Sequence, residues 1–241
     1  MQKILITGAT GFLGGAVTGN LLKKGQINNL LLLVRGETPE EGLERVKKNL
    51  AKFGLNSILL DSLTPQQILP GDLSEPEHFT ADPRLDDVTH VLNCAAVASF
   101  GNNPWIWKVN VEGTFKFASR MSRVSGLKRF VHVGTAMSCA PRANSLVTES
   151  ERATSRQQHI VEYTWSKATI ERMMMESLAC RPDGHGARTE PGPAQRLSFA
   201  NQRGGIQPAG YDAECSPCDG RSCRSVNVGV REEAAGEKRA A

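Results

Sequence analysis

The stretch that decides the fold is "KILITGATGFLGG", residues 3–15. A short apolar run typical of a strand is followed at once by Gly8, Gly11 and Gly14, and then by the residues of a helix. Glycines at this spacing let the backbone turn tightly and approach a pyrophosphate with no Cβ in the way, while the helix N-terminus faces the anion. The stretch therefore predicts a strand–turn–helix unit that binds a dinucleotide.

Strands and helices are predicted to alternate through the rest of residues 1–179. Further strands are predicted at 29–34, within 57–70, at 88–96 and at 129–136, and further helices at 39–54, with Thr38 as its cap, and at 104–125. Alternation of this kind, with right-handed crossovers, predicts an α/β fold with a doubly wound parallel sheet, which is a Rossmann fold.

The composition changes near residue 180. Residues 180–241 contain seven large apolar residues but nine glycines, five prolines and eight arginines. Such a segment cannot bury enough apolar surface to offset the conformational entropy of its chain. We therefore predict a dinucleotide-binding domain at 1–179 and a disordered tail at 180–241.

Arg35 ends the second predicted strand, where an enzyme that prefers NAD often carries an acidic residue. A guanidinium offers a planar fork of donors to phosphate oxygens, so Arg35 favours the 2'-phosphate of NADP. An ordinary solvated arginine is the alternative, and Glu37 could still bind a ribose hydroxyl as in NAD enzymes.

Tyr163 and Lys167 lie four residues apart and so share one face of a predicted helix. An adjacent ammonium would stabilise the phenolate and lower the pKa of Tyr163 toward the working range, so that the phenol could protonate a carbonyl oxygen as hydride reaches the carbon. Such a pair is common by chance. Thr135, at the end of a predicted strand, strengthens the interpretation because its hydroxyl could bind the same oxygen.

Six short motifs together resemble the extended short-chain dehydrogenases/reductases. They are "TGATGFLG" at 7–14, "GDL" at 71–73, "NCAA" at 93–96, "VNVEGT" at 109–114, "HVGTA" at 132–136 and "YTWSK" at 163–167. The stretch "LLLVRG" followed by "TPEEGLERVKKNL" is most similar to the thioester reductase and fatty acyl-CoA reductase branch. The resemblance covers about residues 1–179.

The resemblance implies site residues. Cofactor binding would fall to Thr7, Gly8, Gly11, Phe12, Leu13, Gly14, Arg35, Asp72, Leu73, Ala95, Ala96 and Lys167. Catalysis would fall to Thr135, Tyr163 and Lys167, with Asn110 supporting a proton relay. One departure is Gly134, where many relatives have serine.

The function implied is NADPH-dependent reduction of an acyl thioester or related carbonyl, free or bound to a carrier. One alternative is a nucleotide-sugar epimerase or dehydratase that uses NAD. A second is a dinucleotide-binding fragment without catalysis, because the strand and substrate lid that the family has next are not recognisable after residue 180. We hypothesise that the reading frame shifted there, and we expect the loss to impair turnover.

Other classes of partner are disfavoured by composition. The net charge of +4 is small and both signs are interspersed, so nucleic acid is not expected. No apolar run reaches the roughly 18 residues of a membrane span, and we expect a cytoplasmic protein. The relatives suggest a homodimer as an option.

The cysteines and histidines are expected to have no catalytic or metal-binding role. Zinc binding is an alternative for Cys215, Cys218 and Cys223 with His185, but we interpret this spacing as coincidence and predict no metal site. Cys94, Cys139, His90 and His132 are expected to be packing residues.

Overall fold

The computed structural model describes residues 2–139, 155–178 and 196–200. The chain divides into two units, 1–202 and 203–241, and all described residues belong to the first. The predictions that concern 180–195 and 201–241 therefore lie outside the described residues. These include the disorder of the tail, the missing lid and the cysteines that could bind zinc.

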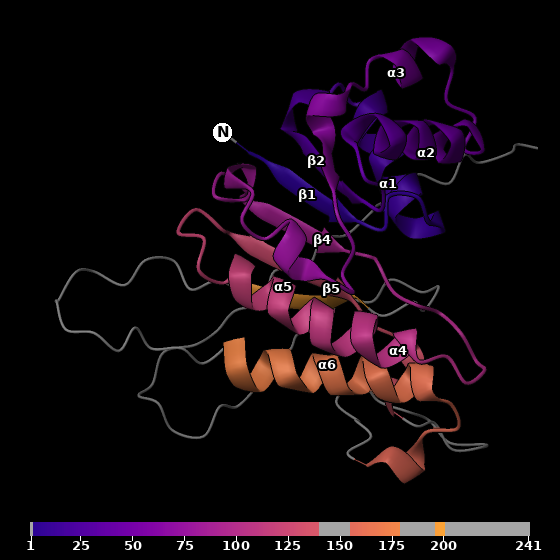
Figure 1. Ribbon diagram of the computed structural model, residues 1–241, viewed down its shortest axis with the longest axis vertical. Helices are drawn as coiled ribbons and strands as arrows, with labels where there is room; N and C mark the ends of the chain where they lie inside the picture. The colour runs from indigo at the N-terminus through magenta and orange to yellow at the C-terminus, as the bar shows by residue number, and fades with distance from the viewer. Residues whose placement is uncertain (1, 140–154, 179–195, 201–241) are drawn as a thin grey trace, which may run out of the picture. The chain divides into compact units, whose positions relative to one another are not determined.

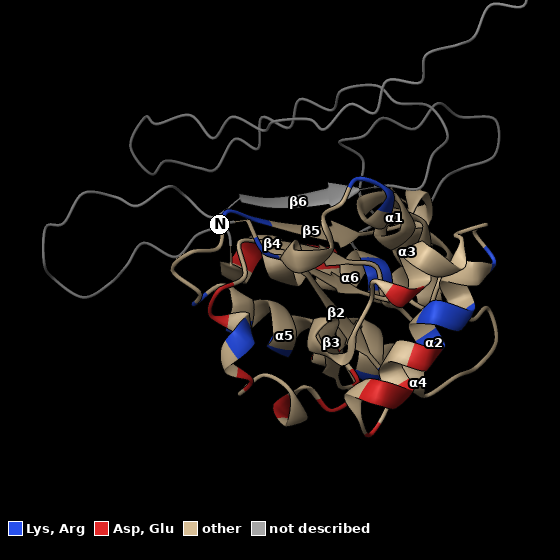
Figure 2. Cartoon of the chain, turned by 90° about the horizontal axis from the view of Figure 1, so that it is seen from above, with Lys and Arg blue, Asp and Glu red and all other residues tan. Residues whose placement is uncertain are grey.

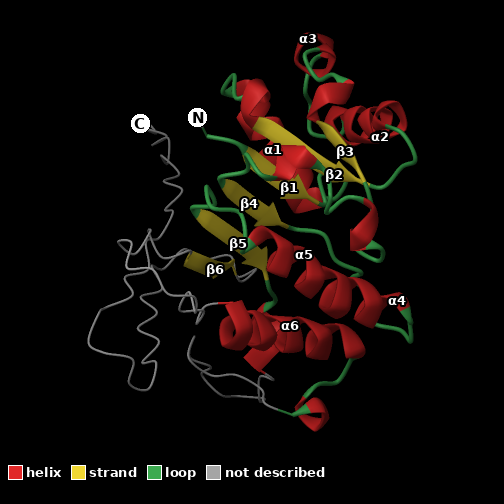
Figure 3. Cartoon of the chain, turned by 60° about the vertical axis from the view of Figure 1, so that its left-hand side comes forward, coloured by secondary structure: helices red, strands yellow, loops and turns green. Residues whose placement is uncertain are grey.

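The described residues form a parallel sheet of six strands in the order β3-β2-β1-β4-β5-β6 (Figure 3). The strands are β1 (Ile4–Thr7), β2 (Leu30–Val34), β3 (Ile68–Pro70), β4 (His90–Asn93), β5 (Arg129–Val133) and β6 (Arg196–Ala200). Ile4 lies opposite Leu30 on one side and His90 on the other, so the chain leaves β1 toward one edge and later returns to continue toward the other. This confirms the predicted doubly wound Rossmann fold.

Helices lie on both faces of the sheet (Figure 1). They are α1 (Phe12–Lys23), α2 (Pro39–Ala51), α3 (Ser57–Asp61), α4 (Trp105–Trp107), α5 (Thr114–Met121) and α6 (Glu162–Leu178). A π-helical turn, Lys108–Gly113, joins α4 to α5, so the predicted helix at 104–125 is interrupted in its middle. Short 3-10 turns lie at Ile27–Asn29, Pro65–Gln67, Pro76–His78, Pro83–Leu85, Ala136–Cys139 and Arg156–Gln158.

β1, β2 and β3 contribute alternate side chains to two cores, because successive residues of a strand point to opposite faces. In β1, Leu5 belongs to one core and Ile6 to the other. The first core packs against α5 and α6 and includes Leu31, Val91, Phe117, Phe130, Ile170 and Met174. The second packs against α1 and α2 and includes Leu22, Leu30, Leu32, Val46, Leu50 and Ile68.

Capping side chains explain where two helices begin. The Thr38 hydroxyl accepts a hydrogen bond from the Glu41 N–H at 3.2 Å, with Pro39 in the first position, as predicted. The strand predicted within 57–70 is confirmed as β3. The residues before it include α3, which begins after Asn56, whose Oδ1 accepts from the Leu59 N–H at 2.9 Å.

The sheet extends beyond the boundary predicted near residue 180. β6 pairs parallel with β5, and Arg129 lies opposite Arg196 while Val133 lies opposite Ala200. The prediction that no strand follows residue 180 is therefore wrong. Five residues within a glycine-rich and arginine-rich segment give too short a pattern to read locally, and the open edge of β5 provides the pairing that they need.

Charged residues of both signs lie along α2 (Figure 2).

Over the described part of the chain, none of the helices is long and apolar enough to cross a membrane.

Candidate dinucleotide-binding and catalytic site

The glycine turn after β1 forms a cradle in which side chains would not fit. Gly8 has φ +72°, and a Cβ there would lie 2.8 Å from the Ala95 nitrogen. A Cβ on Gly14 would overlap the Gly8 carbonyl oxygen, which also accepts from the Gly11 N–H at 2.9 Å. Two of the three motif glycines are thus required by close backbone contacts, as the sequence predicts.

The N-terminus of α1 carries no negative charge of its own. Gly11 is the N-cap, no side chain caps the helix, and its first turn contains no acidic residue. The positive end of the helix dipole and its N–H groups are therefore suited to an anion.

Asn49 of α2 holds the glycine turn in place. Its Nδ2 donates to the carbonyl oxygens of Ala9 at 3.1 Å and Gly11 at 3.0 Å. Sequence reasoning missed Asn49. The available signal was an asparagine in a helix interior, a position where its low helix propensity suggests another role for the side chain.

A cavity of about 590 Å³ opens from this turn. It lies at the carboxyl ends of the strands beside the point where the strand order reverses, the usual place for a ligand in such folds. Eight of the predicted cofactor-binding residues line it: Thr7, Gly8, Gly11, Arg35, Asp72, Leu73, Ala95 and Ala96. Lys167 does not line this cavity, and neither do the turn residues Phe12, Leu13 and Gly14.

Two guanidinium groups lie at the end of β2. Arg35 is largely exposed, and its Nε lies 4.0 Å from Asp72 Oδ2, a surface pair that contributes little to stability. Arg45 of α2 donates from Nη1 to the Arg35 carbonyl oxygen at 2.7 Å. Sequence reasoning missed Arg45, because it lies in the helix ten positions after Arg35.

Tyr163 and Thr135 come from neighbouring segments. The 3-10 turn Ala136–Cys139 follows Thr135 directly and contacts α6, which carries Tyr163 in its first turn. The ring of Tyr163 meets the exposed ring of Phe100 edge to face, with 6.1 Å between centroids.

The predicted pKa of Tyr163 is wrong in direction. Burial raises the pKa of Tyr163 above its usual value, and no lowering by Lys167 accompanies it. The reason is geometric, because Lys167 Nζ approaches His132 Nε2, at 3.4 Å.

Lys167 is deeply buried, with 3% of its surface exposed. Burial lowers the pKa of Lys167 to about 8, while Cys94 and Glu171 act in the opposite direction. His132 is buried in β5, as expected of a packing histidine, yet it also contacts this predicted catalytic lysine.

Asn110 connects two segments through its side chain. Its Oδ1 accepts from the Val97 N–H at 2.7 Å, and its Nδ2 donates to the Val97 carbonyl and to Ser166 Oγ, both at 3.1 Å. The loop after β4 is thereby joined to α6. A π-helical turn carries Asn110, and such turns often occur at functional sites.

Within residues 2–139 and 155–178, no group of three or more histidine, cysteine or acidic side chains could hold a metal ion. The fold, with its cavity beside the glycine turn, defines a domain of the Rossmann type, the fold in which dinucleotides are commonly bound at this place.

The family model described as male sterility protein, an NAD-binding family, matches residues 6–181. Since this match covers most of the chain, the chain belongs to that family.

A curated relative of this chain is fatty acyl-CoA reductase 1 of Mus musculus. It is 26% identical over 200 residues, which cover 76% of this chain and 34% of the mouse protein. The chain thus spans about a third of the length of this relative.

Two solved structures extend the comparison. The terminal R domain from the myxalamid PKS-NRPS pathway has a TM-score of 0.62 and 26% identity, covering 73% of this chain and 46% of that domain. The UDP-glucose 4-epimerase of Thermus thermophilus in complex with NAD, at 20% identity and a TM-score of 0.53, covers 73% of this chain and 52% of that one and shares the fold alone. The predicted resemblance to extended reductases of the fatty acyl-CoA and thioester type is confirmed, and with it membership of a family of NAD(P)-dependent oxidoreductases.

Proposed function

We propose that this domain binds NADPH and reduces an acyl thioester, or a related carbonyl compound, to an aldehyde. The observation that carries the proposal is the cavity, because it joins the anion-binding turn at Gly8 and Gly11 to the guanidinium of Arg35. The family match and the reductase relatives support the same reaction class.

The residues present fit the cofactor. The N-terminus of α1 would bind the pyrophosphate, and Arg35 and Arg45 would bind the 2'-phosphate. Asp72 and Leu73 would contact the adenine, and Ala95 and Ala96 would line the nicotinamide side. Lys167 would turn from His132 to the nicotinamide ribose. Bound NADPH supplies the hydride.

Thr135 and Tyr163 would act on the substrate oxygen. As hydride adds to the thioester carbon, negative charge develops on the oxygen, and both hydroxyls donate hydrogen bonds to it. The raised pKa of Tyr163 keeps the phenol protonated at neutral pH, which suits a donor. The oxygen then re-forms the carbonyl as the carbon–sulfur bond breaks, the thiolate leaves and takes up a proton from solvent, and the aldehyde remains. A second hydride would give the alcohol.

Asn110 would support this site by holding two of its segments together. Its contacts with Val97 and Ser166 fix the loop that follows β4 against the helix that carries Tyr163. A proton relay through Asn110 stays a prediction, as do a carrier-bound substrate, a homodimer and a cytoplasmic location.

A fragment that binds dinucleotide without turnover is a second candidate. One observation favours it, because Tyr163 does not line the cavity. The nucleotide-sugar alternative has less support, because its structural relative shares the fold alone and Arg35 disfavours NAD.

Substrate tests separate these candidates. We expect the midpoint of thermal unfolding to rise with NADPH more than with NADH, and NADPH to be consumed on addition of an acyl-CoA but not of a UDP-sugar. Stabilisation by NADPH without consumption would support the fragment. Stabilisation by neither dinucleotide would refute both proposals.

A further inference from the structure

A buried row of polar side chains connects β1 to the predicted catalytic lysine. Thr7 Oγ1 lies 2.5 Å from Asn93 Oδ1, Asn93 Nδ2 lies 3.0 Å from His132 Nδ1, and His132 Nε2 lies 3.4 Å from Lys167 Nζ. All four side chains are buried. They come from the neighbouring strands β1, β4 and β5 and from α6, and Thr7 at one end of the row also lines the cavity.

The direction of these hydrogen bonds follows from the first two contacts. The Ala95 N–H donates to Thr7 Oγ1 at 3.0 Å, which leaves the Thr7 proton for Asn93. A separation of 2.5 Å lies at the short end of the range for a hydroxyl that donates to oxygen and is too short for an amide nitrogen. The Asn93 oxygen therefore faces Thr7, and its NH2 group donates to His132 Nδ1.

His132 must then carry its proton on Nε2. A neutral imidazole has one protonated nitrogen, and Nδ1 is already an acceptor. Burial, with a smaller contribution from the charge of Lys167, holds the pKa of His132 well below its usual value, so the ring stays neutral. The Nε2–H is thus directed at Lys167 Nζ.

We propose that His132 is a positioning residue for Lys167, and that its Nε2–H favours the neutral amine and thereby sets the pH above which Lys167 stops supporting dinucleotide binding. An ammonium group has three donors and no acceptor, so only the neutral amine can accept this N–H. The inference rests on the proposed NADPH-binding function.

The other titratable groups that face Lys167 do not reverse this effect. Cys94, after β4, stays a neutral thiol because burial raises its pKa to about 11. Tyr163, one turn earlier in α6, stays neutral because burial raises its pKa. Glu171, one turn later, favours the ammonium, but burial outweighs it and lowers the pKa of Lys167 to about 8.

Two substitutions should reverse the hydrogen bond at Lys167. In His132→Gln, the side-chain carbonyl can turn toward Lys167 and accept from the ammonium. In Asn93→Asp, the carboxylate accepts from both Thr7 and His132 Nδ1, so the lone pair of Nε2 then faces Lys167. Each change should keep Lys167 charged to a higher pH.

The test is the dissociation constant of NADPH, measured between about pH 6 and pH 10 for the full chain and both variants. In the unmodified chain we expect the constant to rise above about pH 8, by up to roughly tenfold per pH unit. In both variants this break, the pH at which the dissociation constant begins to rise, should move up by about one pH unit. His90→Gln is the matched control, since His90 lies in β4 and contacts Thr89, and it should leave the break in place.

Unmoved breaks in both variants would overturn the inference. So would binding that weakens equally at every pH while the thermal midpoint is unchanged, because this would indicate a structural role only. If one variant fails to fold, the other decides. If the unmodified chain binds no NADPH at any pH, the proposed function itself fails, and this inference falls with it.

Discussion

The ionisable side chain of Lys167 is buried, because only 3% of the residue's surface is exposed. Because burial lowers its pKa from 10.5 to about 8, the folded chain binds the proton less tightly than the unfolded chain does. Between these two values only the unfolded chain keeps the proton, so stability should rise with pH across that window.

Lys167→Met should therefore stabilise the fold at neutral pH. We expect the free energy of unfolding to increase by about 1–3 kcal/mol at about pH 7, and the gain to shrink near pH 10. Urea denaturation at both pH values measures this. A variant that is less stable at neutral pH would contradict the account of the buried charge.

Arg35 and Arg45 should determine the choice of cofactor. Arg35→Ala and Arg45→Ala should each weaken NADPH binding by about tenfold or more, because each removes donors to the 2'-phosphate, and leave NADH binding nearly unchanged. Dissociation constants for both dinucleotides provide the measurement. Lys47→Ala is the control, since Lys47 pairs with Asp61 on the surface. Equal losses for NADH and NADPH would disprove a 2'-phosphate role.

At the residue level, the predictions from sequence were correct where the cause lies in neighbouring residues and wrong where it lies far away in the chain. The glycines of the turn were predictable because their spacing alone fixes how closely the backbone can pack. The direction of the Tyr163 pKa was not, because it depends on how far the folded chain buries the phenol. It also depends on where Lys167 Nζ lies, and this atom lies beside His132, a residue 35 positions away in another element.

At the scale of elements, Asn49 joins α2 to the turn before α1. Asn49→Ala removes two hydrogen bonds to turn carbonyls, so we expect a loss of stability of about 1–2 kcal/mol and weaker NADPH binding. Asn20→Ala, at an exposed position in α1, is the matched control and should change neither. Denaturation and NADPH titration of both variants provide the measurement. Full-strength NADPH binding by Asn49→Ala would show that the turn holds its shape alone.

Elements with strong local signals were predictable from sequence. The cap at Thr38 and the apolar run of β2 encode their own boundaries. α3 was not predicted, because it has only five residues and the Asn56 cap was not recognised. β6 was missed because its place depends on pairing with β5.

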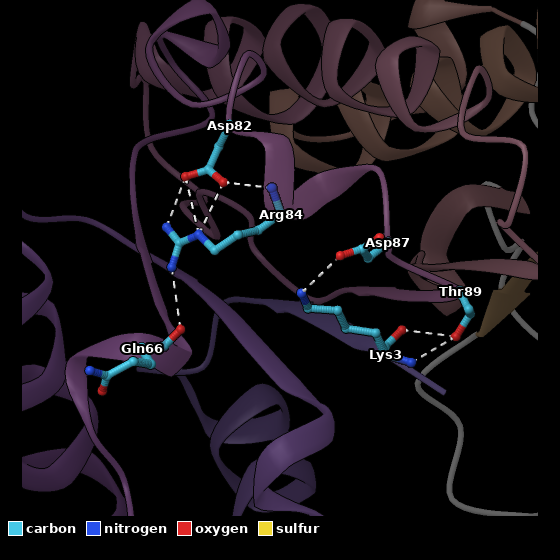
Figure 4. A network of polar contacts seen from close by, with 6 residues as sticks. All are labelled: Lys3, Gln66, Asp82, Arg84, Asp87 and Thr89. Atoms are coloured by element: carbon cyan, nitrogen blue, oxygen red, sulfur yellow. Dashed lines mark hydrogen bonds and ion pairs between the residues drawn. The ribbon is translucent and has the colours of Figure 1, made fainter. Parts of the chain in front are cut away.

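At the scale of the whole described unit, the polar contacts that stabilise the fold and the proposed binding site lie at opposite ends of the strands. Figure 4 shows polar contacts at the amino-terminal ends of the strands, where Arg84 Nη1 donates to the Gln66 carbonyl and Arg84 Nη2 pairs with Asp82 Oδ2 at 2.8 Å. Arg84 Nη1 also donates to the Ile68 carbonyl. Lys3 and Thr89 exchange backbone and hydroxyl hydrogen bonds there. The cavity lies at the carboxyl ends.

Arg84→Met should therefore reduce stability without affecting the site. We expect a loss of about 1–2 kcal/mol, because two backbone carbonyls and a carboxylate lose their donor, and an unchanged NADPH dissociation constant. The hydrogen bond from Arg84 also lowers the pKa of Asp82, so this contribution is present above pH 3.8 and is lost as the pH falls through the lower folded value. Chemical denaturation at neutral and acidic pH tests both. Weakened NADPH binding would show that the contacts at the amino-terminal ends of the strands are coupled to the site at their carboxyl ends.

The central claim is that Tyr163 donates to the oxygen of a thioester reduced by NADPH held on the glycine turn. Its most direct test is NADPH consumption with an acyl-CoA by the full chain and by Tyr163→Phe, with NADPH binding measured in parallel. The account predicts consumption by the unmodified chain and a loss of about a hundredfold or more in the variant, with equal NADPH binding. Equal rates in the two proteins, or no consumption by the unmodified chain, would contradict it.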